Sequence, residues 1–137
     1  MRQKKMTKNL EVGIKNRLEI KVDETKSAIS AGSGTLPVFG TPFVAALMEQ
    51  TAEESVRGCL EEGQATVGTK LVLNHTAATT MGRTAFCESE LVLVDRRRLV
   101  FKVVVCDDAG QVADAEHERF IVDVEKFMDK AGKRGVE

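Results

Sequence analysis

The 137-residue chain contains no tryptophan and no tyrosine, and its 20 lysine and arginine residues nearly balance 21 aspartate and glutamate residues, for a net charge of −1. Nucleic-acid binding needs a broad basic face and aromatic side chains on which bases stack, so this composition argues against a nucleic-acid partner. The chain also lacks any apolar run near the roughly 18 to 20 residues that cross a membrane, and no apolar stretch follows its basic start. We therefore expect a cytoplasmic protein with no membrane partner.

Cysteine and histidine are also scarce. The three cysteines, Cys59, Cys87 and Cys106, are an odd number, lie far apart and fall within apolar segments. This pattern is typical of reduced core residues and not of a disulfide framework. The only histidines are His75 and His117, so the sequence predicts no zinc cluster and no bound metal.

The chain does contain one long helix pattern, at residues 41–60. Thr41 is suited to cap this helix with its hydroxyl, Pro42 suits the first helical position, and Gly63 is a stop signal beyond the end. Residues 43–48 are apolar on every side, whereas a surface helix shows a single apolar stripe. The helix is therefore expected to be enclosed by other structure.

One charged residue of this helix does not fit the apolar pattern. At about 100° per residue, Glu49 falls at the border of the apolar arc, where its neighbours are Ala45, Ala52 and Val56. Two interpretations stay open. Glu49 is either a border residue that reaches solvent or a functional acid with a perturbed pKa in a cleft.

Outside the helix, the pattern is mostly that of strands. Apolar and polar residues alternate over residues 10–22, as in a half-buried strand, and residues 27–40 form a glycine-rich loop. Short turns separate four further strands, which predicts an antiparallel meander. These strands span residues 66–78, 84–95, 98–107 and 111–124, and a short helix follows at residues 124–131.

These elements predict one α+β domain at residues 10–131, with a flexible arm at residues 1–9 and a frayed tail at residues 132–137. A sheet of this kind can wrap its concave face around one buried helix. The expected architecture is the hotdog fold, an antiparallel sheet wrapped around one long central helix.

Three motifs carry a resemblance to a known family: VFGTPFVAALME at residues 38–49, VGTKLVLNHTAAT at residues 67–79 and HERF at residues 117–120. They resemble the fluoroacetyl-CoA thioesterase-like family of hotdog proteins over essentially the whole domain. The resemblance implies an acyl-CoA thioesterase that releases a carboxylate and free CoA, with no cofactor other than the CoA of its substrate. It also implies a homodimer whose two helices lie back to back, with a tetramer left open. It does not imply that fluoroacetyl-CoA is the substrate.

The resemblance also assigns residues to the site. Thr41, Glu49 and His75 match the catalytic set of the family. At 1.5 Å per residue, Glu49 lies about 12 Å along the helix from Thr41, so we expect a second subunit to complete the site at a dimer interface. The amides after Thr41 are predicted to bind the oxyanion, and His75 to orient a carboxylate or water or to protonate the leaving thiolate. The candidate substrate-binding residues are Gly68, Arg119 and Phe39.

Each assignment has a structural alternative. His75 is also compatible with a hydrogen-bonded structural role, and Thr41 with a simple helix cap. Arg119 is either structural or bound to a CoA phosphate, and Gly68 either admits a thioester or marks a bulge. Two other functions fit the same fold: a non-catalytic acyl-CoA-binding protein, and a dehydratase or hydratase that acts on the acyl chain of a thioester.

Overall fold

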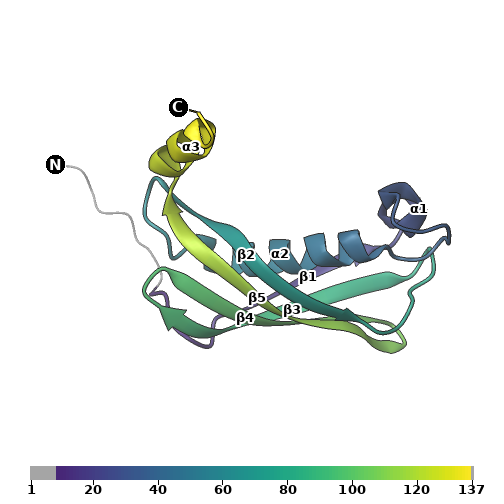
Figure 1. Cartoon of the computed structure of the whole chain (residues 1–137). Coiled ribbons are helices and arrows are strands. Elements are labelled where there is room, and N and C mark those ends of the chain that lie inside the picture. Colours follow the sequence, from purple (N-terminus) through teal and green to yellow (C-terminus); the bar gives the residue numbers. More distant parts are fainter. Residues whose placement is uncertain (1–8, 137) are drawn as a thin grey trace.

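The computed structural model describes residues 9–136 of the chain (Figure 1). In chain order, its elements are β1 (Lys15–Lys21), the 3-10 helix η1 (Glu24–Lys26), α1 (Ala28–Ala31), α2 (Thr41–Arg57), β2 (Gln64–His75), β3 (Thr84–Asp95), β4 (Arg98–Asp107), β5 (Gly110–Asp123) and α3 (Val124–Lys133). The predicted arm at residues 1–9 lies outside the described residues, except for Asn9. Within the described part, no helix has the length and apolar character needed to cross a membrane.

The five strands form one antiparallel sheet in the order β1-β3-β4-β5-β2. The bounds of β3 and β4 agree with the predicted ones, but the predicted four-strand meander is wrong. Strand β2 pairs with β5 at one edge of the sheet and not with β3, so residues 76–83 cross the sheet instead of closing a hairpin. On the way, Thr80 pairs with Val38. Alternation identifies a strand but not its neighbour, which is why the sequence did not reveal this crossing.

The sheet curves around α2, which lies on its concave side (Figure 1). One side of the helix is buried, through Val44, Leu47, Met48, Thr51, Ala52 and Val56. These residues belong to one hydrophobic core with inward-facing strand residues such as Leu91, Leu99 and Phe101. The α+β class is therefore confirmed. The prediction of an enclosed helix holds for one side of α2 only, because Ala46 within the apolar run is exposed.

Both ends of α2 differ from the prediction. Gly40 is the cap, its carbonyl accepts the amides of Phe43 and Val44 (2.9 and 3.0 Å), and no side chain caps the helix. Thr41 is instead the first helical residue, which leaves its hydroxyl available for a contact outside the helix. The helix ends at Arg57, and Gly63 turns the chain into β2 with a φ of +86°.

The predicted loop at residues 27–40 contains the short helix α1, which the side chain of Ser27 caps. Four residues carry too little periodicity for a helix to be recognised from sequence. Ser27 pairs with Phe39, and the amide of Gly40 donates to the carbonyl of Lys26 (2.8 Å). The two ends of the loop are therefore held together.

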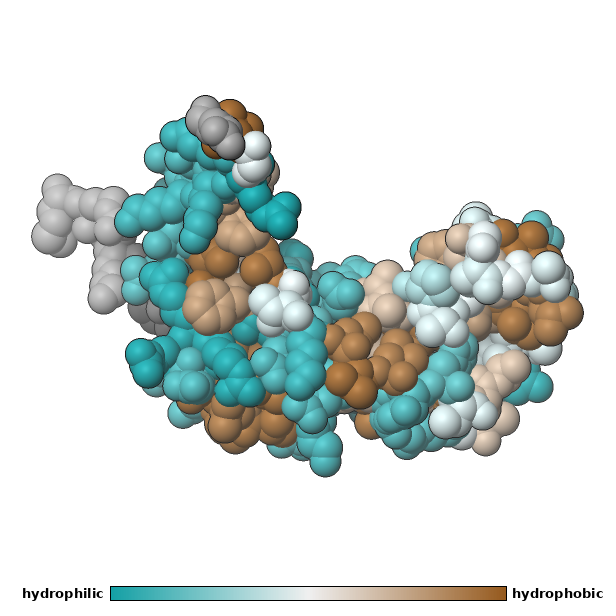
Figure 2. Space-filling view, viewed as in Figure 1, coloured by the Kyte–Doolittle hydropathy of each residue, from teal (hydrophilic) through white to brown (hydrophobic). Residues whose placement is uncertain are grey.

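Helices α1 and α3 stand at opposite ends of the molecule (Figure 1). Figure 2 shows that the surface is hollowed between them. Helix α3 continues two residues beyond the predicted end, to Lys133. Both helices project on the same side of the molecule in Figure 1.

The three cysteines form no disulfide, as predicted, but only Cys87 is a buried core residue, whereas Cys59 and Cys106 are partly exposed. Cys87 is fully buried, and burial raises its pKa to about 11. Burial also raises the pKa of Cys106, and the thiol of Cys59 lies 3.7 Å from the carbonyl of Asn9. Across residues 9–136, no three His, Cys, Asp or Glu side chains are grouped so as to hold a metal ion.

Candidate active site

Thr41 and His75 meet at the start of α2. The Thr41 hydroxyl lies 2.7 Å from Nδ1 of His75, although 34 positions separate the two residues in the chain. Thr41 is the first residue of α2, and His75 is the last residue of β2, where it pairs with Ala113. The contact depends on two elements that the sheet brings together, so it is more than a helix cap.

Burial favours the neutral form of His75. Burial lowers its pKa because the charged imidazolium would lose solvation, although the backbone at Ala77 acts in the opposite direction. The other ring nitrogen, Nε2, is buried without a hydrogen-bond partner among the residues described. A neutral imidazole beside a hydroxyl can accept its proton.

A pocket of about 320 Å³ opens beside this pair. Its walls come from α1, the loop after it, the start of α2 and the end of β2. They comprise Ala28, Ser33, Val38, Phe39, Thr41, His75, Thr76, Ala77 and Ala78. Phe39 is only 1% exposed, so it supports the wall, whereas Thr41 is exposed and can be reached from solvent.

The start of α2 offers one backbone donor to a ligand. Pro42 has no N–H, and the carbonyl of Gly40 accepts the amides of Phe43 and Val44. The Thr41 amide has no acceptor within residues 9–136. The sequence predicted the amides after Thr41 as donors, but the structure leaves the amide of Thr41 itself at the positive end of the helix.

Glu49 lies in a second polar cluster, with Arg119 and His117. Nη1 of Arg119 lies 3.8 Å from Oε1 of Glu49 and 3.1 Å from Nε2 of His117. Arg119 is only 6% exposed and also donates to the hydroxyl and the carbonyl of Thr66 (2.8 and 3.0 Å). His117 donates from Nδ1 to the carbonyl of Lys70 (2.8 Å), so its Nε2 is the acceptor for Arg119.

The cluster surrounds a buried positive charge. Burial lowers the pKa of His117, and the nearby Arg119 acts in the same direction. Burial also lowers the pKa of Arg119, while Glu49 opposes this change. The Glu49 side chain is 47% exposed, so it extends from the buried cation to the surface. Its predicted place at the border of the apolar arc is confirmed.

Gly68 lies against this cluster. A Cβ at this position would be 3.1 Å from Oε1 of Glu49 and 3.3 Å from Nη1 of Arg119, which is tighter than a side chain normally allows. The register of β2 also shifts between Gly68 and Lys70. The predicted bulge is therefore present, and the missing side chain makes room for the cluster.

Within one chain, the predicted site residues form two groups. Phe39, Thr41 and His75 meet at the start of α2, and Glu49, Gly68 and Arg119 meet about two turns along the helix. Among the residues described, no hydrogen bond or ion pair joins the two groups. Sequence reasoning missed the anchoring residue Thr66, because its place beside Arg119 follows from the β2–β5 pairing.

A buried pair outside the predicted site holds the pocket wall. The Thr79 hydroxyl donates to Oδ2 of Asp107, and the amide of Ala109 donates to Oδ1, both at 2.8 Å. Burial by itself raises the pKa of Asp107, but these hydrogen bonds outweigh it, so the pKa lies below its ordinary value. The Thr79 carbonyl accepts the amide of Phe39 (2.8 Å), which ties the pocket loop to this pair.

We expect Thr79→Val to lower the free energy of unfolding by about 1 to 3 kcal/mol, because the buried Asp107 carboxylate loses a donor. Thr79→Ser keeps the hydroxyl and is the matched control. Denaturant unfolding of the two variants and the wild type measures the difference. An unchanged midpoint for the valine variant would show that Asp107 does not depend on Thr79.

The chain is similar in sequence to known thioesterases. The family model "FlK: Fluoroacetyl-CoA-specific thioesterase" matches residues 22–125. The fluoroacetyl-CoA thioesterase of Streptantibioticus cattleyicolor is 35% identical over 97 residues, which are 71% of this chain and 70% of that protein.

Solved structures show the same similarity. A structure of the fluoroacetyl-CoA thioesterase FlK matches with a TM-score of 0.86 at 29% identity, over 92% of this chain and 98% of that one. An FlK variant in complex with fluoroacetate and CoA matches with a TM-score of 0.80 at 30% identity, over 86% of this chain and 99% of that one. A hot-dog-like protein from Thermanaerovibrio acidaminovorans shares the fold, with a TM-score of 0.84 at 22% identity, over 92% of this chain and 93% of that one. The predicted hotdog fold is thus confirmed, and the chain belongs to the fluoroacetyl-CoA-specific thioesterase family, a family of thioester hydrolases.

Proposed function

We propose that this chain hydrolyses an acyl-CoA thioester to a carboxylate and free CoA, with Thr41, His75 and Glu49 taking part. The observation that carries the proposal is the 2.7 Å contact between the Thr41 hydroxyl and Nδ1 of His75, a histidine whose neutral form is favoured by burial. The pair lies at the positive end of α2 beside an open pocket, where a thioester carbonyl can enter. Membership of the thioesterase family supports the same reaction class.

The proposed reaction places the thioester carbonyl against the first turn of α2. The Thr41 amide and the helix dipole stabilise the negative charge that forms on the carbonyl oxygen. His75 takes a proton at Nδ1, either from the Thr41 hydroxyl or from a water in its place. The carbon–sulfur bond then breaks, and His75 returns the proton to the CoA thiolate. With Thr41 as nucleophile, an acyl ester forms and water hydrolyses it, whereas with water as nucleophile the carboxylate forms directly.

Glu49 is proposed to act from a second copy of the chain. Along one helix, Glu49 lies about 12 Å from Thr41, too far for direct contact. In a homodimer with antiparallel central helices, Glu49 of one copy approaches the Thr41–His75 pair of the other. There it can accept a proton from the water that hydrolyses the acyl ester, and this proton passes to the Thr41 oxygen as the ester bond breaks.

The groups around Glu49 are proposed to receive the acyl part of the substrate. Gly68 leaves room beside Glu49, and Arg119 lies directly behind it. The phosphate-binding alternative for Arg119 is less well supported, because this guanidinium is buried and already bonded to Thr66. Phe39 contributes to the pocket wall at the other end of the site. We propose a cytoplasmic homodimer that needs no cofactor apart from the CoA of its substrate.

Free-thiol release from a panel of acyl-CoA esters tests the proposed function. The panel contains acetyl-CoA, fluoroacetyl-CoA, and branched, aromatic and long-chain esters. We expect turnover of at least one ester, and that ester names the acyl class. If no ester releases thiol although acyl-CoA binds tightly, the chain is a binding protein. If the acyl chain gains or loses water without thiol release, it is a hydratase or dehydratase.

A further inference from the structure

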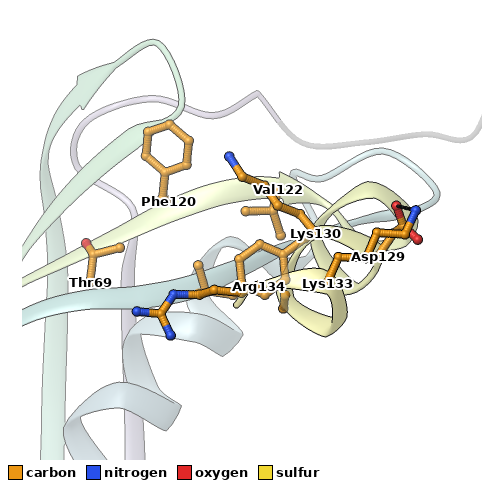
Figure 3. A pocket seen from close by; sticks show the side chains of 10 residues that line it. Thr69, Phe120, Val122, Asp129, Lys130, Lys133 and Arg134 are labelled. Atoms are coloured by element: carbon orange, nitrogen blue, oxygen red, sulfur yellow. Dashed lines mark hydrogen bonds and ion pairs between the residues drawn. The ribbon is translucent and has the colours of Figure 1, made fainter. Parts of the chain in front are cut away.

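His117 is a buried histidine that the proposed reaction does not use. It lies on β5, where alternate residues face opposite sides of the sheet. Figure 3 shows Phe120 and Val122 of this strand lining a groove of about 820 Å³ beside α3. His117 and Arg119 have the other parity and face α2, where they are only 1% and 6% exposed. Polar side chains buried this deeply are stable only when they are hydrogen-bonded.

Two neighbouring strands hold the His117 ring in place. The ring of Phe101 on β4 packs against it, with 6.1 Å between centroids and an angle of 33° between the planes. Nδ1 of His117 donates to the carbonyl of Lys70 on β2 (2.8 Å). Because this carbonyl takes the proton of the neutral ring, the opposite nitrogen, Nε2, carries a lone pair and accepts a hydrogen bond.

Three hydrogen bonds fix the guanidinium of Arg119, and His117 accepts one of them. Nε and Nη2 donate to the hydroxyl and the carbonyl of Thr66 (2.8 and 3.0 Å), and Nη1 donates to Nε2 of His117 (3.1 Å). Oε1 of Glu49 lies 3.8 Å from the same Nη1, a distance at which the charges attract but no hydrogen bond forms. The sheet therefore sets the position of the guanidinium.

This arrangement requires a neutral His117. A protonated ring would carry hydrogens on both nitrogens, and the hydrogen on Nε2 would point at a cation. Burial lowers the pKa of His117, and the nearby Arg119 acts in the same direction, while the Lys70 backbone and the carboxylates of Glu49 and Glu118 oppose them. The ring is thus an acceptor for Arg119 and not a second cation.

We propose that His117 is a positioning residue that acts on Glu49 through Arg119. By accepting the hydrogen bond from Nη1, it holds the guanidinium short of the carboxylate. Oε1 of Glu49 then has a positive charge nearby and stays open to the water whose proton it takes. Without this acceptor, the buried Nη1 would close the remaining gap to Glu49, and the water would compete with a charge-assisted hydrogen bond. The role rests on the proposed function of Glu49.

Two substitutions separate the acceptor from the rest of the side chain. His117→Asn places an amide near Nδ1, where it still donates to Lys70 but does not reach Arg119. His117→Gln is the matched control, because its longer side chain brings an amide oxygen close to the position of Nε2. We expect kcat for thiol release to fall by about tenfold in the asparagine variant and to stay within about threefold of the wild type in the glutamine variant. KM is expected to change little, because only the chemical step needs an open Oε1.

A double-mutant cycle shows whether the effect passes through Glu49. In the Glu49→Gln background, we expect His117→Asn to change kcat by less than about twofold, because no base is left to keep open. A histidine that served only the fold would lower the rate by the same factor in both backgrounds. Equal losses in the two backgrounds, or equal rates for the asparagine and glutamine variants, would overturn the proposal. Urea unfolding of each variant shows that folded proteins are compared.

Nitrogen NMR determines the tautomer of His117 without any turnover. The chain has two histidines, so His75→Gln leaves His117 as the only one and assigns its ring nitrogens. We expect the proton on Nδ1 and none on Nε2 above about pH 7. An active wild type with the proton on Nε2 would contradict the role of His117 alone. A wild type that releases no thiol from any ester would contradict the hydrolase, and this role with it, whichever tautomer is found.

Discussion

Glutamine at position 49 is expected to reduce kcat for thioester hydrolysis by about a hundredfold or more, the range typical of a lost general acid or base. The amide of Glu49→Gln keeps the shape of the side chain and can still accept a hydrogen bond from Arg119. It cannot take a proton from the attacking water. Steady-state thiol release with the ester that the wild type turns over measures the loss.

Glu54→Gln is the matched control for this variant. Glu54 lies on the same helix but bonds to Gln50 (3.0 Å), away from Arg119, so its rate is expected to equal that of the wild type. Because Arg119 is buried and Glu49 is half exposed, loss of the negative charge is expected to lower the free energy of unfolding by up to about 3 kcal/mol, the low end for a buried pair, and thermal unfolding shows where the variant is folded. Rates near wild type in Glu49→Gln would remove Glu49 from the mechanism.

Hydrolysis is expected to slow in acid as His75 takes a proton. Burial lowers the pKa of His75, so the acid limb of kcat/KM is expected below the ordinary histidine value of 6.5. His75→Gln is expected to remove this limb and to reduce kcat by about a hundredfold or more, because the proton acceptor for the Thr41 hydroxyl is lost. Rates measured from about pH 5 to pH 8 cover the titration.

The free energy of unfolding is also expected to fall as the pH is lowered. The pKa values of His75 and His117 are both lowered in the folded state, so in acid the unfolded chain binds more protons than the folded one. This contribution to stability is fully present at a pH above the pKa of a histidine in the unfolded chain. It is lost as the pH falls through the lower pKa values of the folded state. Thermal unfolding at each pH shows where the enzyme is folded and the rates are valid. An acid limb that persists in His75→Gln would exclude His75 as its origin.

The fold could be predicted as far as its patterns are local. The apolar run at residues 43–48 predicted an enclosed helix, of which only one side is buried in this chain. The alternation of residues 84–107 gave two strands with the observed bounds. The partner of β2 could not be predicted, because the same alternation fits next to β3 or next to β5. Helix α1 was missed because its four residues contain about one turn.

The site could be predicted in its residues but not in its geometry. Motif resemblance selected Thr41 and His75, and the structure brings them into contact. Thr41 was expected as the cap, but a shift of one residue makes Gly40 the cap and turns the threonine hydroxyl to His75. The surroundings of Arg119 depend on the pairing of two strands and on a bulge, which a single sequence does not specify.

The pocket loop at residues 27–40 is anchored at its base and exposed between its anchors. Ser27 and Phe39 close its base, and the hydrogen bond between Phe39 and Thr79 holds that base to the sheet. Residues 32–37 between these anchors are all exposed, whereas Thr41 is fixed by α2 and His75 by β2. Loops closed at the base tolerate changes of length and sequence. We therefore expect substrate preference to change through substitutions in this one segment while the Thr41–His75 contact stays in place.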